Sequence, residues 1–172
     1  MITSFRNDKK SQVFQRELYQ LHYRRIYNTC LRIIGNSRDA EEAMQDVFLK
    51  IFDTIDSLQD ESAFYSWTQQ IAIRTAIDKV RKQKPVFEPV DNLSVVDEEP
   101  DEEPDLSVES VKRELNNLPS GYRIVLSMRL FEECEFEAIA QALQIKESTV
   151  RSQYIRGRDK LAKMLKSKIN KQ

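Results

Sequence analysis

Charge is distributed very unevenly along this chain of 172 residues. Residues 86–111 contain ten acidic residues and no lysine or arginine, and four of the five prolines lie between positions 85 and 104. Like charges, prolines and few apolar side chains prevent a segment from burying enough surface to fold. We therefore expect residues 86–111 to form an extended acidic linker between two small domains, residues 1–85 and 112–172.

The two flanking segments are basic and rich in residues that favour helices. Residues 1–85 carry 14 basic and 11 acidic residues, and residues 112–172 carry 13 and 7, although the whole chain has a net charge of −1. Only 3 residues are glycine, and apolar residues recur with the helical period of about 3.6. The pattern predicts an all-α fold, with two small helical domains joined by an acidic flexible linker.

Several classes of protein are disfavoured by composition. No apolar run approaches the roughly 20 residues that a spanning helix needs, and residues 1–6 lack the apolar stretch of an export signal. We therefore expect a cytoplasmic protein. Cys30 and Cys134 lie far apart, and His22 is the single histidine. These residues predict no disulfide, no metal site, no histidine-dependent catalytic triad and no cofactor, with His22 as a surface or packing residue.

The hydrophobic periodicity of the first domain predicts three helices, over residues 12–34, 39–55 and 63–84. Gly35 is a typical signal for the end of the first helix. Asp39 and Glu42 have the spacing of a capping box at the start of the second. A polar break, residues 56–62, separates the second helix from the third.

The helix predicted over residues 39–55 has two distinct faces. One is apolar and must belong to the core: Met44, Val47, Phe48, Ile51 and Ile55. The opposite face mixes polar and acidic residues with one leucine, and Phe52 lies at its margin: Glu42, Gln45, Asp46, Leu49 and Asp53. It is either an ordinary solvated face with one stray leucine or a docking face for a basic partner surface.

The third predicted helix changes character along its length. Phe64, Trp67 and Ile71 have the spacing of core residues, whereas Tyr65 falls off that stripe and is the better candidate for exposure and base stacking. A second apolar stripe follows in the C-terminal half: Ile73, Ala76, Ile77 and Val80. The polar side of that half suits either pairing along the helix or contact with phosphate; it comprises Arg74, Asp78, Arg81 and Lys82.

The second domain has the layout of a helix-turn-helix. Helices are predicted over residues 111–118, 122–131 and 136–143, and a long one begins at Glu147. Gln144 occupies a turn position where glycine is common, because φ is often positive there, and we expect about 1 kcal/mol of strain. Ile139, Leu143, Ile145 and Val150 are expected to fill the core between the two helices, with Ala140 at their crossing.

The long helix is also two-faced. Its inward stripe is Val150, Tyr154, Gly157, Leu161, Met164 and Leu165. Its outward face holds Ser148, Thr149, Ser152, Ile155 and Arg156, with Arg151, Gln153 and Arg158 on the flanks. Arginine with small polar residues near the N-terminal half of such a helix is suited to the major groove of DNA. The alternative is that these charges only keep the surface soluble.

The motifs together resemble the bacterial sigma-70 family, in its short extracytoplasmic-function (ECF) branch. Residues 39–50 look like the polymerase-binding motif of that family. Residues 62–67, 71–72 and 76–82 are similar to its promoter-melting and −10-reading segments, and residues 118–123, 137–140 and 148–152 resemble its −35-reading domain. The resemblance covers both domains in the order that the family has.

The resemblance implies a detachable specificity subunit of RNA polymerase, which is not itself an enzyme and starts transcription at specific promoters in response to an envelope or environmental signal. The implied partners are core RNA polymerase, promoter DNA and an anti-sigma factor, with no small-molecule substrate. The residues implied to bind core polymerase are Glu42, Gln45, Asp46, Leu49 and Asp53. Those implied for the −10 element are Asp56, Ser57, Gln59, Ser62, Tyr65, Arg74, Asp78, Arg81 and Lys82. Those implied for the −35 element are Arg123, Ser148, Thr149, Arg151, Ser152, Ile155, Arg156 and Arg158.

Two departures from the family pattern bear on this assignment. Arg74 stands where many members have asparagine, which leaves the −10 preference open, and Gly157-Arg158 replaces Ala-Arg. The acidic linker is open to two interpretations. It is either a solvated spacer or a mimic of nucleic acid that lies along a basic polymerase channel, as the resemblance suggests.

Three other functions remain as alternatives. A helix-turn-helix regulator that binds duplex DNA without polymerase explains residues 112–172, but it leaves the Leu49 face and the loop before Ala63 without a purpose. A helical adaptor that does not bind DNA would give no function to the face that carries Arg151 and Arg156. The hypothesis of an enzyme that uses carboxylates is weaker still. Its candidates are the acidic pairs Glu41-Glu42 and Glu132-Glu133, and solvation alone explains both pairs.

Overall fold

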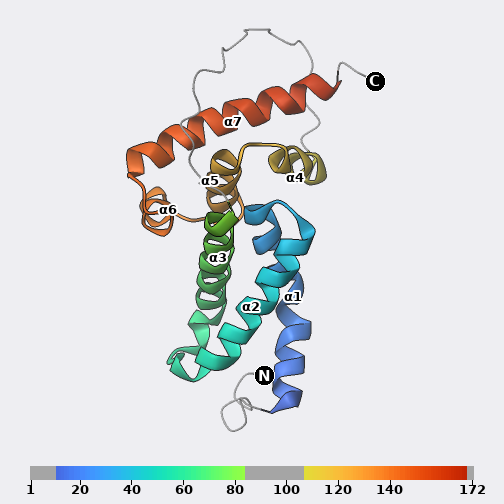
Figure 1. Cartoon of the computed structure of the whole chain (residues 1–172), viewed down its shortest axis with the longest axis vertical. Coiled ribbons are helices and arrows are strands. Elements are labelled where there is room, and N and C mark those ends of the chain that lie inside the picture. Colours follow the sequence, from blue (N-terminus) through green and yellow to red (C-terminus); the bar gives the residue numbers. More distant parts are fainter. Residues whose placement is uncertain (1–10, 84–106, 170–172) are drawn as a thin grey trace. The chain divides into compact units, whose positions relative to one another are not determined.

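The computed structural model describes residues 11–83 and 107–169, and within these ranges all regular structure is helical (Figure 1). This confirms the predicted all-α fold with two helical domains. Backbone contacts divide the chain into two compact units, residues 1–80 and 81–172, and each is treated below by itself. Most of the acidic segment lies outside the described residues. No helix in the described ranges is long and apolar enough to cross a lipid bilayer.

The N-terminal unit is built from three helices with two short 3₁₀ turns: α1 (Gln12–Ile34), α2 (Ser37–Thr54), η2 (Ile55–Ser57), η3 (Glu61–Ala63) and α3 (Phe64–Gln83). The Ser11 side chain caps α1 by accepting the Phe14 N–H at 3.2 Å. Gly35 ends α1 with a φ of 89°, a left-handed conformation that glycine adopts without a steric penalty. The predicted end of this helix is confirmed.

The start of α2 differs from the prediction. The helix begins at Ser37, and its cap is Asn36 rather than Asp39. The Asn36 side chain accepts the Asp39 N–H at 2.9 Å and donates to the Asp39 carboxylate at 2.8 Å. The predicted capping box at Asp39 and Glu42 is therefore wrong, because the side chain of an asparagine just before the helix caps it one turn earlier.

The apolar stripe of α2 forms the centre of the N-terminal core. All five predicted core residues of α2 are buried, and Val47 and Ile51 have no exposed surface. The second stripe of α3 is buried as predicted: Ile73, Ala76, Ile77 and Val80. Lys79 of α3 pairs with Glu42 of α2 at 2.7 Å, and the Lys50 amine donates to the Thr75 hydroxyl at 2.9 Å. Polar contacts at the surface thus supplement the apolar packing between α2 and α3.

The prediction that Phe64, Trp67 and Ile71 belong to the core is only partly right. All three are half-buried. The Phe64 ring lies 5.1 Å from the His22 ring of α1 and 6.2 Å from the Trp67 ring. The Phe64 ring therefore packs against α1 and Trp67 packs against Phe64, while all three side chains keep part of their surface exposed.

The C-terminal unit contains α4 (Val108–Asn116), α5 (Ser120–Leu130), α6 (Phe136–Leu143) and α7 (Glu147–Ile169). Residues 108–110 are helical, although the sequence assigned them to the linker and predicted a helix only from Val111. The cause is Ser107, whose hydroxyl accepts the Ser110 N–H at 3.2 Å and starts the helix three residues early. Glu109 lies in the first turn of α4, where the helix dipole favours an acid.

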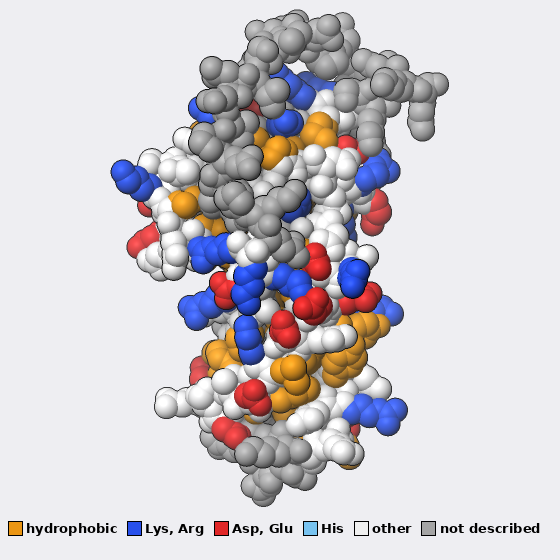
Figure 2. All heavy atoms as spheres, viewed as in Figure 1, with side chains coloured by type: hydrophobic (Ala, Val, Ile, Leu, Met, Phe, Trp, Pro, Cys, Tyr) orange, Lys and Arg blue, Asp and Glu red, His pale blue; other side chains and the backbone are white. Residues whose placement is uncertain are grey.

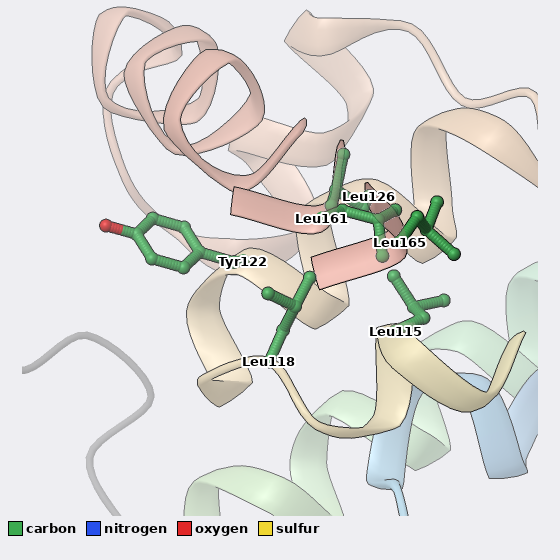
Figure 3. Packing of buried hydrophobic residues seen from close by; sticks show 6 residues of the cluster. All are labelled: Leu115, Leu118, Tyr122, Leu126, Leu161 and Leu165. Atoms are coloured by element: carbon green, nitrogen blue, oxygen red, sulfur yellow. The ribbon is translucent and has the colours of Figure 1, made fainter. Parts of the chain in front are cut away.

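The core of this unit joins α4 and α5 to α7. Figure 3 shows the six buried side chains of one cluster: Leu115, Leu118, Tyr122, Leu126, Leu161 and Leu165. Gly157 permits the close approach of α7 to α5. A Cβ atom there would lie 3.0 Å from the Tyr122 Cβ and 3.2 Å from a Leu126 methyl carbon. The backbones therefore approach at a point where even alanine would be tight.

The turn between α6 and α7 has the predicted strain. Gln144 adopts φ 56° and ψ 42°, the left-handed region where a residue with a Cβ costs about 1–2 kcal/mol. Ile145 donates its N–H to the Ala140 carbonyl at 3.1 Å and closes the end of α6. Ile139, Leu143 and Val150 are buried behind this turn, whereas Ile145 is only half-buried.

The contact at Gly157 makes a testable prediction. Gly157→Val should destabilise the C-terminal unit by about 2 kcal/mol or more, because overpacking against a fixed Cβ outweighs the gain in helix propensity. Ala162→Val is the matched control on the exposed side of α7 and should cost only about half a kcal/mol. Thermal or urea unfolding measures both, and equal losses for the two variants would contradict the close packing.

Candidate functional site

The outer face of α2 is exposed and mixed in character. Leu49 is 62% exposed, and Gln45, Asp46 and Asp53 are exposed beside it. Phe52 is half-buried at the margin, as its position on the helix predicts. Figure 2 shows hydrophobic side chains interspersed with carboxylates over α1 and α2. A leucine surrounded by acids provides both apolar contact area and a charge preference for a basic surface.

Aromatic residues extend this face onto α1. Tyr19 is 39% exposed; its ring stacks on Tyr23 at 5.6 Å and lies 4.7 Å from the Phe48 ring. Phe48 in turn lies 5.9 Å from Phe52. The sequence did not single out Tyr19 or Tyr23, because only the packing of α1 against α2 brings them beside the Leu49 face.

Glu42 differs from the other residues assigned to this face. Its carboxylate is paired with Lys79 at 2.7 Å, where the lysine side chain is only 15% exposed. The Glu42 side chain remains 65% exposed, so the pair contributes at most about 1 kcal/mol to stability. Glu42 therefore serves the α2–α3 joint, whatever it contributes to a partner.

The loop between α2 and α3 is held in shape by its own side chains. The Asp60 carboxylate accepts the Ser62 N–H and the Ser62 hydroxyl, each at 2.8 Å, and these bonds lower the pKa of Asp60. The Ser57 hydroxyl donates to the Thr54 carbonyl at 2.6 Å. All four loop residues assigned to the −10 element are exposed: Asp56, Ser57, Gln59 and Ser62. The Ser62 hydroxyl is engaged in the turn itself.

Tyr65 follows this loop and is 56% exposed, as its position off the apolar stripe predicts. Arg25 of α1 lies over its ring at 4.9 Å and donates to the Tyr65 carbonyl at 3.2 Å. The His22 ring packs against both the Phe64 and the Tyr65 ring, at 5.1 and 5.4 Å. Partial burial, with a smaller effect of the Arg25 charge, lowers the pKa of His22, which is consistent with a packing role. The sequence missed Arg25, because 40 residues separate it from Tyr65.

The polar side of α3 presents the remaining residues assigned to the −10 element. Arg74, Asp78 and Lys82 are exposed, and Arg81 is half-buried. This side of α3 carries three basic residues and one acidic residue, so its net charge suits contact with phosphates. The exposed Tyr65 ring adds a surface on which a base can stack.

The outer face of α7 is the third exposed face. Ser148, Ser152 and Arg156 are exposed, Ile155 is 51% exposed, and Thr149 is half-buried. Arg151 pairs with Glu147, and Arg158 pairs with Asp159 at 3.1 Å. Among the described residues, no acidic group lies within 4.0 Å of the Arg156 guanidinium. Arg156 therefore keeps its charge available for a ligand.

Arg123 lies in a different environment from the arginines of α7. Its side chain is half-buried, and its Nη1 donates to the Leu118 carbonyl at 3.3 Å. Burial lowers the pKa of its guanidinium. Part of Arg123 therefore supports the turn between α4 and α5, and less of it is open to DNA than the sequence suggests.

Neither cysteine of the chain forms a disulfide; Cys30 is buried, and burial is the main cause that raises the pKa of Cys134. In the part of the chain that is described, no three His, Cys, Asp or Glu side chains come together in a way that would hold a metal ion.

Comparison with protein families matches both units. The model of sigma-70 region 2 matches residues 18–86, and the model of sigma-70 region 4 matches residues 108–161. The first range contains the α2 face, the loop and α3. The second contains the helix-turn-helix and most of α7.

The chain is also similar to known sigma factors over most of its length. The chain is 29% identical over 164 residues to the ECF RNA polymerase sigma factor SigW of Bacillus subtilis, covering 87% of this chain and 88% of that protein. It is also 29% identical to the RNA polymerase sigma-H factor of Pseudomonas aeruginosa, covering 87% and 85%. The fold resembles the structure of the sigma factor RpoE in complex with the anti-sigma factor NepR from Bartonella quintana, with a TM-score of 0.58, 20% identity and coverage of 88% and 96%. This chain belongs to the sigma-70 family, in its ECF branch.

Proposed function

We propose that this protein is a sigma factor that binds core RNA polymerase and directs it to specific promoters, without catalysing a reaction itself. The observation that carries the proposal is the presence of both family regions in one chain, each with an exposed face suited to its task. It acts where the polymerase acts, in the cytoplasm.

The face of α2 is the docking surface for core polymerase in this proposal. Leu49 supplies apolar area at its centre, and Gln45, Asp46 and Asp53 surround it with polar and acidic groups. Because Met44 and Ile51 are buried on the opposite side, changes to the outer face leave the core untouched. Glu42 stays in the set, with its role shared between the partner and Lys79.

The loop after α2 and the polar side of α3 are proposed to handle the −10 element. The two turns of the loop display polar groups toward solvent, and Tyr65 offers a ring on which a base can stack. In this proposal Arg74, Arg81 and Lys82 contact the phosphates of the same strand, and Asp78 lies between Arg74 and Arg81 in the helix sequence. The aromatic and basic side chains suit single-stranded DNA better than a duplex.

The N-terminal part of α7 is proposed to enter the major groove of the −35 element. Arg151 and Arg156 can each read a guanine or a phosphate, and Ser148, Thr149 and Ser152 can bond to bases or phosphates. Ile155 offers an apolar contact to a thymine methyl group, Arg158 flanks the face, and Arg123 adds a backbone contact from α5.

An anti-sigma factor is proposed as a further partner, active in the response to an envelope or environmental signal. The support is the solved complex of a protein with this fold. A DNA-binding regulator that works without polymerase remains the alternative, because α7 alone would serve it. It is weaker, since it gives no role to the Leu49 face.

One experiment separates the proposal from this alternative. The purified full chain is mixed with core RNA polymerase, and complex formation is measured by pull-down and by gel filtration. A complex that no longer forms with the α2 variant described next supports the proposal. Failure of the wild-type chain to bind core polymerase, while duplex DNA is still bound, would favour the alternative.

Leu49→Arg should weaken binding to core polymerase by tenfold or more, because it places a charge at the centre of an apolar contact. Gln45→Ala with Asp46→Ala should weaken it in the same direction. Leu21→Arg is the matched control, since Leu21 is 72% exposed and lies about 200° around α1 from Tyr19. Equal affinity of the Leu49→Arg and Leu21→Arg proteins for core polymerase, with both folded, would remove α2 from the interface.

Arg156→Ala should weaken promoter binding by the holoenzyme. If Arg156 reads a base, the loss should be about 1–3 kcal/mol at one position of the −35 element; if it meets phosphate, binding should drop evenly and the salt slope should fall by about one. A scan of promoter positions at two salt concentrations distinguishes the two. Lys112→Ala on α4 is the control, and an Arg156→Ala holoenzyme with unchanged affinity at every position would exclude Arg156.

A further inference from the structure

Phe136 is the first residue of α6, and its ring contacts the Arg151 side chain of α7. We propose that Phe136 is a positioning residue for DNA recognition: its ring and Glu147 together hold the Arg151 guanidinium in the orientation in which it meets the −35 duplex. The inference rests on the proposed function and names a residue outside the set that the sequence assigned to DNA.

The contacts around Phe136 form a small cluster. The Arg151 guanidinium lies over the ring at 4.7 Å from its centre, within the range of a cation–π interaction. The Tyr154 ring meets the Phe136 ring edge-on at 5.3 Å. Tyr154 is one helical turn after Arg151, so both contacts come from the same side of α7.

Phe136 is itself held in place from α5. Arg129 lies 5.1 Å from the centre of the Phe136 ring. The same guanidinium donates to the Cys134 carbonyl at 3.1 Å and to the Glu135 carboxylate at 3.0 Å, in the segment just before α6. The ring therefore sits on a braced segment and can act as a fixed platform for Arg151.

Glu147 fixes the orientation of the Arg151 guanidinium from its other side. One oxygen of its carboxylate accepts bonds from Nε and Nη2 of Arg151, at 2.8 and 2.5 Å. A guanidinium has five N–H donors, so three remain, and two of these point from the edge formed by Nη1 and Nη2. Within the described part of the chain no other hydrogen bond is made to this edge. This edge can make two parallel bonds to a guanine or a phosphate while Glu147 occupies the other edge.

This arrangement orders Arg151 before DNA binds. The side chain is still 58% exposed, and a free arginine of that exposure would sample many rotamers and lose them on binding. The ring and the carboxylate limit those rotamers in advance, which lowers the entropic cost of the contact. Removing the ring should therefore reduce affinity through Arg151, and only there.

The test uses the full chain assembled with core polymerase, with promoter affinity measured across single substitutions of the −35 element. Phe136→Leu keeps an apolar side chain but removes the ring, and we expect promoter binding to weaken about two- to tenfold, the cost of ordering one long side chain. The loss should be confined to the promoter positions that Arg151→Ala affects. Phe136→Tyr, which keeps the ring, should bind nearly as well as wild type.

A double-mutant cycle separates positioning from folding. In the Arg151→Ala background, Phe136→Leu should have no further effect on promoter binding. Phe131→Leu is the matched control, since Phe131 packs against the leucine cluster instead of Arg151, and its effect should be the same with or without Arg151. Thermal unfolding of each variant reports any general loss of structure.

Several results would overturn the inference. Additive losses in the cycle, or an even loss at all −35 positions, would show that Phe136 only supports the fold. No loss for Phe136→Leu, or a loss of the same size for Phe136→Tyr, would remove the ring from recognition. An Arg151→Ala holoenzyme with wild-type promoter affinity would overturn the inference and the assignment of Arg151, while the proposal of a sigma factor would still stand on core binding.

Discussion

The packing of α7 against α5 determines what the C-terminal unit can present to a partner. Because Gly157 brings the two helices together at Tyr122 and Leu126, one side of α7 is committed to the core along most of its length. The other side is then necessarily exposed, and it carries the arginines and small hydroxyl residues. A bulkier residue at 157 would push α7 away and change the pose of every one of them.

The same principle operates in α2 of the N-terminal unit. Six apolar residues of α2 are buried on one side, so Leu49 and its acidic neighbours face either solvent or a partner. Polar and ring contacts then adjust the positions of single side chains. Glu42 pairs with Lys79 and joins α2 to α3. In the C-terminal unit, Glu147 and Phe136 orient Arg151. Burial defines the faces, and charge and ring contacts define how single side chains lie on them.

Helical periodicity and local chain signals made the fold predictable from the sequence. Gly35 marks the end of α1 and Gln144 is left-handed as predicted, because both depend on the local backbone alone. The Asn36 cap and the early start of α4 at Ser107 were missed, since several polar residues near each start are competent caps. The half-buried state of Phe64 and Trp67 was also missed, because spacing reports which face a residue occupies and not what covers it.

For the candidate site, the sequence predicted which helix faces are exposed but not the contacts of single side chains on them. The exposed sides of α2 and α7 follow from the period of the helix, but the contacts that modify single residues join segments far apart in the chain. The Arg25–Tyr65 contact and the pairing of Glu42 with Lys79 are of this kind. No local pattern announces them, because they arise only when helices pack.

The central claim is that this chain gives core polymerase a promoter preference that neither has alone. The most direct measurement is transcription in vitro from genomic DNA fragments by core polymerase with and without the full chain, followed by mapping of the RNA 5′ ends. The account predicts new start sites that depend on the chain and share two upstream elements at a fixed spacing. RNA 5′ ends that are the same with and without the chain, while the chain still binds core polymerase, would contradict it.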